Sequence, residues 1–478
     1  MGTEASAQYE SANRDWQRAY DLALRWSRNN VRDFGGRRAL VEGGGYQKLW
    51  LETQPMGGEM FAAWDMEAAL FNQLLFIRHQ RADGRLPGSI RLNGDGSVTP
   101  EYNKLQGFCF PRHALNMYWL GVGDEGYLRE LRDCLQAWDG YLWRTRDTDG
   151  DGCLRSFCVY DTGEDNALRY GDAPNYWEDD APPRGYASVP MASMDVTSWS
   201  YASRDTLRLI SLALGDGRAA EWEDKARAVR EAIRRRLWDE KRGACFDRGP
   251  DGSVKPELVH NTLRCMYFES LTQSMAQQFT EAHLKNPREF WTPFPLPSVS
   301  VSDPLFRSVP ENNWSGQCEG LTWQRAVPAL ESYGMHKLVT RLGRIWLENL
   351  SRWGFRFVQQ YDPFTGRPSL IRKDTHDSAP EGWQGPVEEG YGPSCLTTLT
   401  FLSRLQGVAV GRGRVWYSAV SGFAAKWERT LGGHSYLMES DGSRFTAWYD
   451  GTAIGTQDCG SRLVTDMNGK PLSSITIE

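Results

Sequence analysis

The sequence lacks the features that mark a membrane protein or a nucleic-acid binder. No apolar run approaches the roughly 18 residues that a membrane-spanning helix needs. Lysine and arginine are scattered, and the 478 residues carry a formal net charge of −6, whereas a nucleic-acid binder would show a basic stripe. The first residues show no signal-peptide pattern. We therefore expect a cytoplasmic protein with neither a membrane nor a nucleic acid as its partner.

Metal-binding patterns are missing as well. The seven histidines form no pair at helical spacing, and the nine cysteines include no Cys-x-x-Cys motif. Asp147, Asp149 and Asp151 resemble the first half of an EF-hand loop, but Cys158 stands where that loop needs its bidentate glutamate. We expect no metal and no organic cofactor, and we interpret the cysteines as reduced, buried thiols.

Aromatic residues, by contrast, are plentiful. The chain has 20 Trp, 19 Tyr and 19 Phe, together 12% of its residues. Trp and Tyr combine a broad apolar face with a polar edge, which suits them to sugar rings, although most of the Trp residues should lie in the core. The composition therefore favours a small carbohydrate as the partner. It leaves homo-oligomerisation open.

Hydrophobic periodicity predicts a mostly helical protein. From about residue 411 onward, short β-like runs with Gly-rich turns replace the helical pattern. We expect an all-α-dominated α/α toroid with long loops over 1–410 and a small β-rich region over 411–478. Residues 1–10 are expected to be frayed and 36–60 to form a loop with a short strand. Helices are expected at about 13–33, 61–78, 111–121, 124–143, 194–214, 218–238, 266–284, 317–332, 336–350 and 394–406.

Residues 161–169 carry the main candidate for chemistry. Glu164 and Asp165 lie among a glycine, an asparagine and Arg169, close to an aromatic, acidic loop that contains Trp177. A carboxylic acid among aromatic and hydrogen-bonding neighbours is what general acid catalysis on a sugar requires. An acidic surface loop would give the same pattern, so both interpretations stay open at this point.

Six stretches follow one another over about residues 60–405: Trp64-Asp65-Met-Glu-Ala-Ala-Leu-Phe71, residues 146–152, Thr162-Gly-Glu-Asp165-Asn-Ala-Leu-Arg169, residues 286–298, Asn313-Trp-Ser-Gly-Gln-Cys318 and Tyr361-Asp-Pro-Phe-Thr-Gly366. In this order they resemble elements of the trehalase-like clan of inverting glycosidases. The resemblance is greatest to glycoside hydrolase family 63 and its bacterial mannosylglycerate and glucosylglycerate hydrolases. It implies an (α/α)6 barrel and hydrolysis with inversion.

The resemblance also implies roles for single residues. Asp165 corresponds to the general acid, and Asn166 and Arg169 would orient it or bind the sugar. In the clan, the general base is a glutamate two residues before the Tyr of the last element, and here that position is Gln359. An amide cannot accept a proton from water at neutral pH, so Gln359 cannot act as the base.

Three explanations of Gln359 remain open. The chain can be an inactivated variant whose native residue is glutamate, or the base can be Glu388, Glu389 or Glu319. The third explanation is a protein that binds a carbohydrate without hydrolysing it.

The leading expectation is an inverting exo-glycosidase that acts on a small, α-linked, gluco- or manno-configured glycoside. Asp65 begins an apolar helix, so it is either a helix cap or a ligand for sugar hydroxyls. The expected pocket residues are Trp64, Asp65, Asp165, Asn166, Arg169, Trp177, Trp314, Gln359, Tyr361, Trp383 and Glu389.

Overall fold

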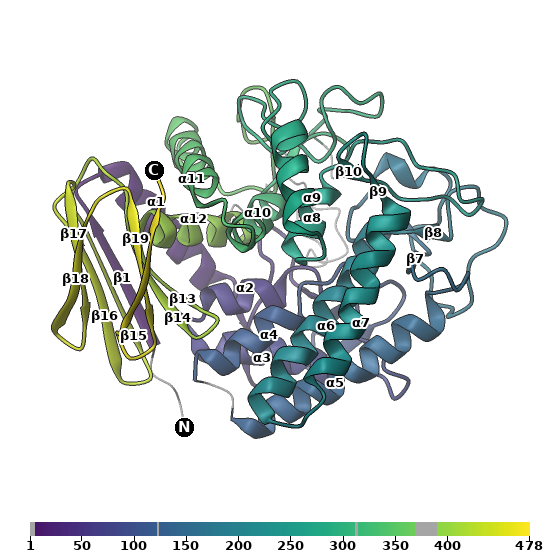
Figure 1. Cartoon of the computed structure of the whole chain (residues 1–478), viewed down its shortest axis with the longest axis horizontal. Coiled ribbons are helices and arrows are strands. Elements are labelled where there is room, and N and C mark those ends of the chain that lie inside the picture. Colours follow the sequence, from purple (N-terminus) through teal and green to yellow (C-terminus); the bar gives the residue numbers. More distant parts are fainter. Residues whose placement is uncertain (1–4, 122–123, 311–313, 370–389) are drawn as a thin grey trace.

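The computed structural model describes residues 5–121, 124–310, 314–369 and 390–478. Helices form one part of the molecule, and a β-sheet unit lies at one end (Figure 1). Over these residues there are twelve α-helices: α1 (Arg14–Asn29), α2 (Gln54–Phe61), α3 (Met66–Arg78), α4 (Pro111–Trp119), α5 (Glu125–Thr145), α6 (Met194–Leu214), α7 (Ala219–Ala232), α8 (Asn261–Tyr267), α9 (Gln273–Phe279), α10 (Gly320–Ser332), α11 (His336–Arg352) and α12 (Gly392–Leu405).

The even-numbered helices form a closed ring. Helix α2 contacts α4, and contacts continue through α6, α8, α10 and α12 back to α2. Odd-numbered helices pack outside this ring, with α3 on α2, α5 and α7 on α6, and α11 and α1 on α12. This arrangement is an α/α-barrel type of fold.

Burial separates the two sets of helices. The outer helix α11 buries one face, including Val339, Leu342 and Trp346, and leaves its other face in water. The ring helix α12 buries nearly every residue, which fits a helix that is apolar all round. None of the helices in the described ranges has the length and apolar character needed to cross a bilayer.

Two expectations about helices were wrong. Helix α2 forms within the stretch expected to be loop, although it contains Pro55, Gly57 and Gly58. A Cβ atom on Gly58 would lie 2.9 Å from Cβ of Asn72, so the glycine allows α2 and α3 to approach closely. The single helix expected over 266–284 is instead α8, α9 and a π-helical turn at Thr280–Leu284.

The β unit consists of two antiparallel sheets, with strand orders β1-β15-β16-β17-β18 and β13-β14-β19-β20. Its strands are β1 (Ala5–Ser11), β13 (Gln406–Gly411), β14 (Arg414–Ala419), β15 (Ala425–Leu431), β16 (His434–Ser440), β17 (Arg444–Tyr449), β18 (Thr452–Asp458), β19 (Ser461–Asp466) and β20 (Pro471–Thr476). The expected frayed N-terminus was wrong for 5–10, because β1 pairs with β15 and sets Tyr9 opposite Trp427. The expected boundary near residue 410 falls inside β13.

Eleven short strands occur in the described loops. They are β2 (Val31–Asp33), β3 (Arg38–Leu40), β4 (Leu49–Trp50), β5 (Ser89–Leu92), β6 (Val98–Glu101), β7 (Arg155–Ser156), β8 (Met191–Ala192), β9 (Trp238–Asp239), β10 (Ala244–Cys245), β11 (Cys318–Glu319) and β12 (Gln360–Tyr361). Strands β11 and β12 pair with each other, so the segment just after Gln359 is fixed against the start of α10.

Gly343 of α11 allows a test of the packing between α11 and α12, and Gly140 of α5 supplies the control. A Cβ atom on Gly343 would lie 2.6 Å from Leu405 Cδ1 and 2.8 Å from the Phe401 ring, whereas one on Gly140 of α5 would meet nothing within 4 Å. We expect G343A to lower the free energy of unfolding by about 1–3 kcal/mol through overpacking. The matched control G140A should raise it by up to about 1 kcal/mol. Urea denaturation measures both, and equal stabilities would contradict the close packing of these helices.

Candidate active site

A cavity of about 70 Å³, here called the Asp165 cavity, lies where the N-terminal ends of the ring helices meet the loops. Its walls include residues from the segments that lead into α2, α4 and α12, from the start of α10, and from the loop that carries Asp165. Two groups of lining residues contain its carboxyl groups, and Lys104, Tyr160 and Tyr176 are further ionisable residues of the lining. The first group is Glu52, Gly163 and Asp165, and the second is Glu42, Tyr46, Gln359 and Tyr391.

The Asp165 loop is tied to the segment before β11. The backbone oxygen of Asp165 accepts a hydrogen bond from Trp314 N at 3.1 Å, and Leu168 N donates to Ser315 Oγ at 3.0 Å. Asn166, directly after Asp165, has a φ of 55°, in the left-handed region that asparagine tolerates better than most residues. These contacts hold the Asp165 side chain at the cavity wall, where it is partly buried.

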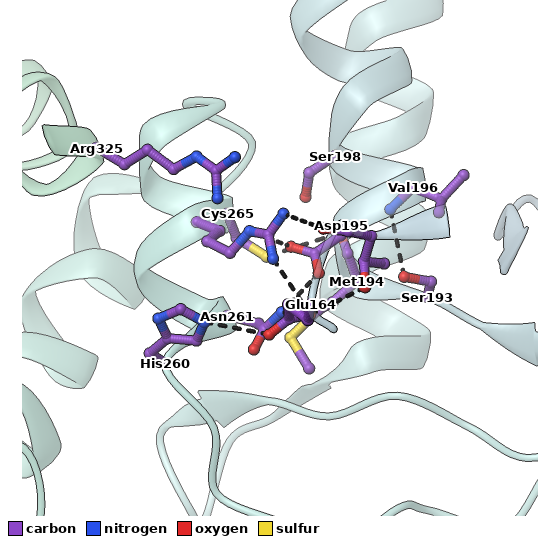
Figure 2. Close-up of polar contacts among 12 residues, drawn as sticks. Glu164, Ser193, Met194, Asp195, Val196, Ser198, His260, Asn261, Cys265 and Arg325 are labelled. Atoms are coloured by element: carbon purple, nitrogen blue, oxygen red, sulfur yellow. Dashed lines mark hydrogen bonds and ion pairs between the residues drawn. The ribbon is translucent and has the colours of Figure 1, made fainter. Parts of the chain in front are cut away.

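Beneath this loop lies a buried cluster of charges, here called the anchor cluster: Glu164, Arg169, Asp195, Asp247 and Arg264. Figure 2 shows two of its carboxylates, Glu164 and Asp195, with His260 and Asn261 beside Glu164. Arg169 pairs with Glu164 and with Asp247, the latter at 2.7 Å. Arg264 contacts Glu164 at 3.2 Å and Asp195 at 3.4 Å. The cluster is buried from water, so its charges depend on one another for stabilisation.

Glu164 is the centre of the anchor cluster. Besides its arginine partners, it accepts a hydrogen bond from Asn261 Nδ2 at 2.9 Å and lies 3.2 Å from His260 Nε2. Burial alone would raise the pKa of Glu164, but Arg169 and Arg264 outweigh burial and hold that pKa well below its usual range. Glu164 is therefore a fixed anion that anchors the loop, and its neighbour Asp165 is the carboxyl that reaches the cavity.

Glu52 is the second carboxyl of the first group. Its Oε1 atom accepts a hydrogen bond from Arg325 Nη2 at 3.1 Å, and its Oε2 atom lies 3.4 Å from Gln106 Nε2. Burial raises the pKa of Glu52 to about 7; Arg325 lowers it, and Asp165 raises it further. A Cβ atom on Gly163 would lie 2.0 Å from Glu52 Oε2, so only glycine fits at that position.

The second group surrounds Gln359. Tyr46 donates its hydroxyl hydrogen to Gln359 Oε1 at 2.7 Å, and Tyr391 donates to Glu42 Oε1 at 2.9 Å. Burial first, and then the charge of Glu42, raise the pKa of Tyr391 well above its usual range. The backbone of Tyr391 also donates to Phe357 O, which ties Glu42 and Gln359 into one wall.

Comparison with known proteins identifies the family. The sequence profile of the mannosylglycerate hydrolase MGH1-like glycoside hydrolase domain matches residues 61–385, well over half of the chain. The chain belongs to this family. No curated relative matches it.

Solved structures share the fold of this glycoside hydrolase at low sequence identity. The GH63 mannosylglycerate hydrolase of Thermus thermophilus, solved with glucose, is 17% identical with a TM-score of 0.61 over 80% of this chain and 100% of that one. Neutral trehalase Nth1 of Saccharomyces cerevisiae is 14% identical, with a TM-score of 0.56 over 78% of this chain and 74% of that one. A solved sialidase is 14% identical, with a TM-score of 0.71 over 97% of this chain and 41% of that one.

Within this family member, the predicted site residues fall into distinct places. Asp165, Trp314 and Gln359 line the Asp165 cavity together. Asn166 is exposed beside it. Arg169 is buried in the anchor cluster and does not line the cavity. Its contacts make it a residue that positions the Asp165 loop.

Two predicted aromatic residues lie just outside the cavity. Tyr361 is buried against Phe294 and Trp346, and its hydroxyl donates to a backbone oxygen at 2.9 Å. Trp177 donates its indole hydrogen to Ala181 O at 2.9 Å, whereas its neighbour Tyr176 lines the cavity.

Trp64 and Asp65 lie away from the cavity. The Trp64 indole donates to Ala7 O at 3.1 Å, and its ring packs 6.3 Å from Trp427 of the β unit. Asp65 caps α3 by accepting a hydrogen bond from Ala68 N at 3.0 Å, and it also pairs with Arg38. Of the two interpretations that the sequence left open for Asp65, this geometry fits the helix cap.

The remaining candidates are Glu319, Trp383, Glu388 and Glu389. Glu319 is fully buried, accepts a hydrogen bond from Gln360 Nε2 and is absent from the cavity lining. Trp383, Glu388 and Glu389 lie outside the described residues.

Sequence reasoning missed the N-terminal contribution to the site. Glu42, Tyr46, Trp50 and Glu52 all line the cavity, yet this stretch was interpreted as a Gly-rich loop. The available signal was the alternation of carboxyl and aromatic residues around three consecutive glycines. That pattern resembles the one that drew attention to residues 161–169.

The raised pKa of Glu52 predicts a pH dependence of stability. The folded state holds a proton on Glu52 up to about pH 7, whereas the unfolded chain releases it near the ordinary pKa of 4.5. The resulting stabilisation is therefore fully present below pH 4.5 and is lost as the pH rises through about 7, by at most about 1.4 kcal/mol per pH unit.

E52Q should remove this slope, because an amide does not titrate. Urea unfolding at a series of pH values between about 5 and 8 measures the slope, with the exposed Glu67 changed in E67Q as the control. Equal slopes in the wild type and E52Q would show that Glu52 does not titrate in this range.

Proposed function

We propose that this chain is an inverting glycosidase of (α/α)6-barrel type in which Asp165 protonates the leaving oxygen and Glu42 activates the attacking water. The observation that carries this proposal is that Asp165 and Glu42 line one cavity, where the charge of Asp165 acts on Glu52 and Glu42 accepts a hydrogen bond from Tyr391. Inverting glycosidases need two carboxyl groups on either side of the bond, separated by enough space for a water molecule. Membership of a glycoside hydrolase family supports this chemistry.

A small substrate fits the size of the cavity. The volume of about 70 Å³ is far below the roughly 300–1,000 Å³ of sites for drug-sized ligands, which favours a small substrate. Structures of the Thermus thermophilus protein contain glucose in one case and D-glycerate with Tris in another. We therefore propose exo-attack on a small, α-linked, gluco- or manno-configured glycoside. Trp314 and Asn166 are proposed to contact the sugar, and Trp383 and Glu389 stay predictions.

Asp165 suits the role of general acid because of its neighbour. Burial first, and also the charge of Asp165, raise the pKa of Glu52 to about 7, so Glu52 retains a proton near neutral pH, which we propose it shares with Asp165. A proton retained there is available for transfer to the leaving oxygen. The anchor cluster, through Glu164, keeps the donor in place while the proton moves.

Glu42 suits the role of general base because a hydrogen bond favours its ionised form. A base must be ionised, and the hydroxyl of Tyr391 donates a hydrogen bond to Glu42 that stabilises the charged form. Gln359 beside it cannot take a proton, but its Oε1 atom accepts from Tyr46 and so helps to shape the wall. Glu42 thus offers a base on the wall that carries Gln359.

The exchange of each carboxyl for an amide tests the two roles. We expect D165N and E42Q each to lower kcat/KM by roughly 10²–10⁴-fold on a panel of α-glucosides, α-mannosides, trehalose and mannosylglycerate. D179N, at an exposed position of the neighbouring acidic loop, is the control and should leave the rate unchanged. Proton NMR of the first product should show the inverted anomer. Full activity of E42Q would remove Glu42 as the base.

Restoring a carboxylate at position 359 separates the explanations of Gln359. If Glu42 is the base, Q359E should leave kcat unchanged or lower it, because a second negative charge then competes on the same wall. A gain of 10²-fold or more in Q359E would instead indicate that the chain is an inactivated form of an enzyme with glutamate at this position.

A carbohydrate-binding protein without hydrolytic activity is the second candidate, and the amide at position 359 is the observation that favours it. In that case neither the wild type nor Q359E hydrolyses any member of the panel, and isothermal titration calorimetry shows sugar binding that D165N and E42Q retain. Hydrolysis by the wild type would exclude this candidate.

A further inference from the structure

A second and larger cavity, here called the Arg429 cavity, lies at the other ends of the ring helices. Its volume is about 490 Å³. It is lined by residues near the C-terminal ends of α2, α8, α10 and α12, by α4 along its length, by α6, and by strands β13, β14 and β15 of the β unit. The Asp165 cavity lies at the N-terminal ends of the ring helices, so the two cavities are separate. A volume of this size falls within the range of small-molecule sites.

Arg429 faces this cavity from β15. Inward and outward residues alternate along the strand, and Arg429 shares the inner face with Trp427 and Leu431. Only 8% of Arg429 is exposed. Its Nε atom is buried without a hydrogen-bond partner, and within the described part of the chain Arg429 forms no ion pair.

A buried guanidinium without a partner is costly. Arginine cannot discard its charge at physiological pH, and an isolated buried charge loses its hydration without compensation. Burial lowers the pKa of Arg429 to about 10, and the charge of Glu59 only partly opposes this shift. The native fold therefore retains a group that would be stabilised by an anion in the cavity.

Three of the four carboxylates around the cavity form ion pairs with other arginines, whereas the fourth, Glu59, contacts His113 and is the carboxylate whose charge acts on Arg429. Glu59 lies 3.0 Å from His113 Nδ1, and Asp205 lies 3.0 Å from Arg112 and 2.8 Å from Arg208.

Two more carboxylates complete the set. Glu269 pairs with Arg112 and Arg412, and Glu331 pairs with Arg404 and with Arg462 at 2.9 Å. The lining thus contains five arginines, at positions 112, 208, 404, 412 and 429, and four carboxylates. Arg429 is the one of these five arginines with no ion pair within the described ranges, and Glu59 is the carboxylate whose charge acts on it from a distance.

We propose that the Arg429 cavity binds a small oxyanion, carried by a carboxylated sugar or by an inorganic anion, through a forked contact with Arg429. Planar guanidinium groups recognise such anions with two parallel hydrogen bonds. Four Trp residues, at positions 64, 119, 416 and 427, supply apolar faces for a ring attached to the anion. Arg412, whose side chain is 54% exposed, lines the cavity at a solvent-accessible point.

Isothermal titration calorimetry at constant ionic strength tests the proposal with three probes: sodium sulfate, sodium D-glucuronate and neutral glucose. We expect sulfate or glucuronate to bind the wild type, with R429M weakening that binding at least about tenfold (about 1.4 kcal/mol). R429K keeps the charge but loses the fork, and it should bind with intermediate affinity. K426M, on the same strand but with its side chain on the opposite face, is the matched control and should bind as the wild type does.

Stability supplies an independent readout. Without the anion, R429M should unfold at the same temperature as the wild type or higher, because it removes an unpaired buried charge. Saturating anion should then raise the melting temperature of the wild type but not that of R429M. Equal anion affinity in R429M and the wild type overturns the proposal. So does the absence of binding by both anions, or binding of glucose alone. Glycosidase activity is not needed for any of these outcomes.

Discussion

The Asp165 cavity depends on one physical constraint, the mutual neutralisation of buried charges in the anchor cluster. Two arginines, Arg169 and Arg264, are shared among three carboxylates, and each lacks the water that would otherwise solvate it. Loss of one partner would leave an uncompensated charge in the interior, which is far more costly than loss of an exposed pair. The loop that carries Glu164 therefore has little conformational freedom. The position of the next residue, Asp165, is restricted as well.

The arrangement of the helices explains how the charges of the anchor cluster come together. Asp195 lies in the first turn of α6, where the partial positive charge of the helix end favours a carboxylate. Arg264 comes from α8, the next helix of the ring. The ring thus brings the charges of the anchor cluster together at the N-terminal ends of its helices. At the opposite ends the β unit contributes Arg429, whose charge has no comparable set of partners among the described residues.

Sequence periodicity was a good guide to the helices, and ordered motifs were a good guide to the family. Amphipathic helices such as α5 and the long ring helix α6 could be placed because their apolar positions recur at helical spacing. Helix α2 could not, since Gly57 and Gly58 serve close contact with other helices and weaken the local helical signal.

The site was harder to predict than the fold, for a reason that particular residues make clear. Arg169 and Asp165 belong to one motif, but one side chain points into the anchor cluster and the other lines the cavity. Only the three-dimensional arrangement separates them. Glu42 and Glu52 precede every recognised motif, and they reach the cavity because the ring closes between α12 and α2.

The amide at position 359 is best understood through the charge of the whole cavity. Asp165, Glu52 and Glu42 already bring three carboxyl groups to a space of about 70 Å³, against one lysine, Lys104, in the same lining. A fourth on the Gln359 wall would compete with Glu42 for the ionised state, because like charges at short range raise each other's pKa. With an amide there, Tyr46 still finds its acceptor and Tyr391 stabilises a single negative charge on Glu42. An inverting mechanism needs one ionised base on that side and no more, so the loss of a carboxylate at 359 is compatible with catalysis if Glu42 supplies the base.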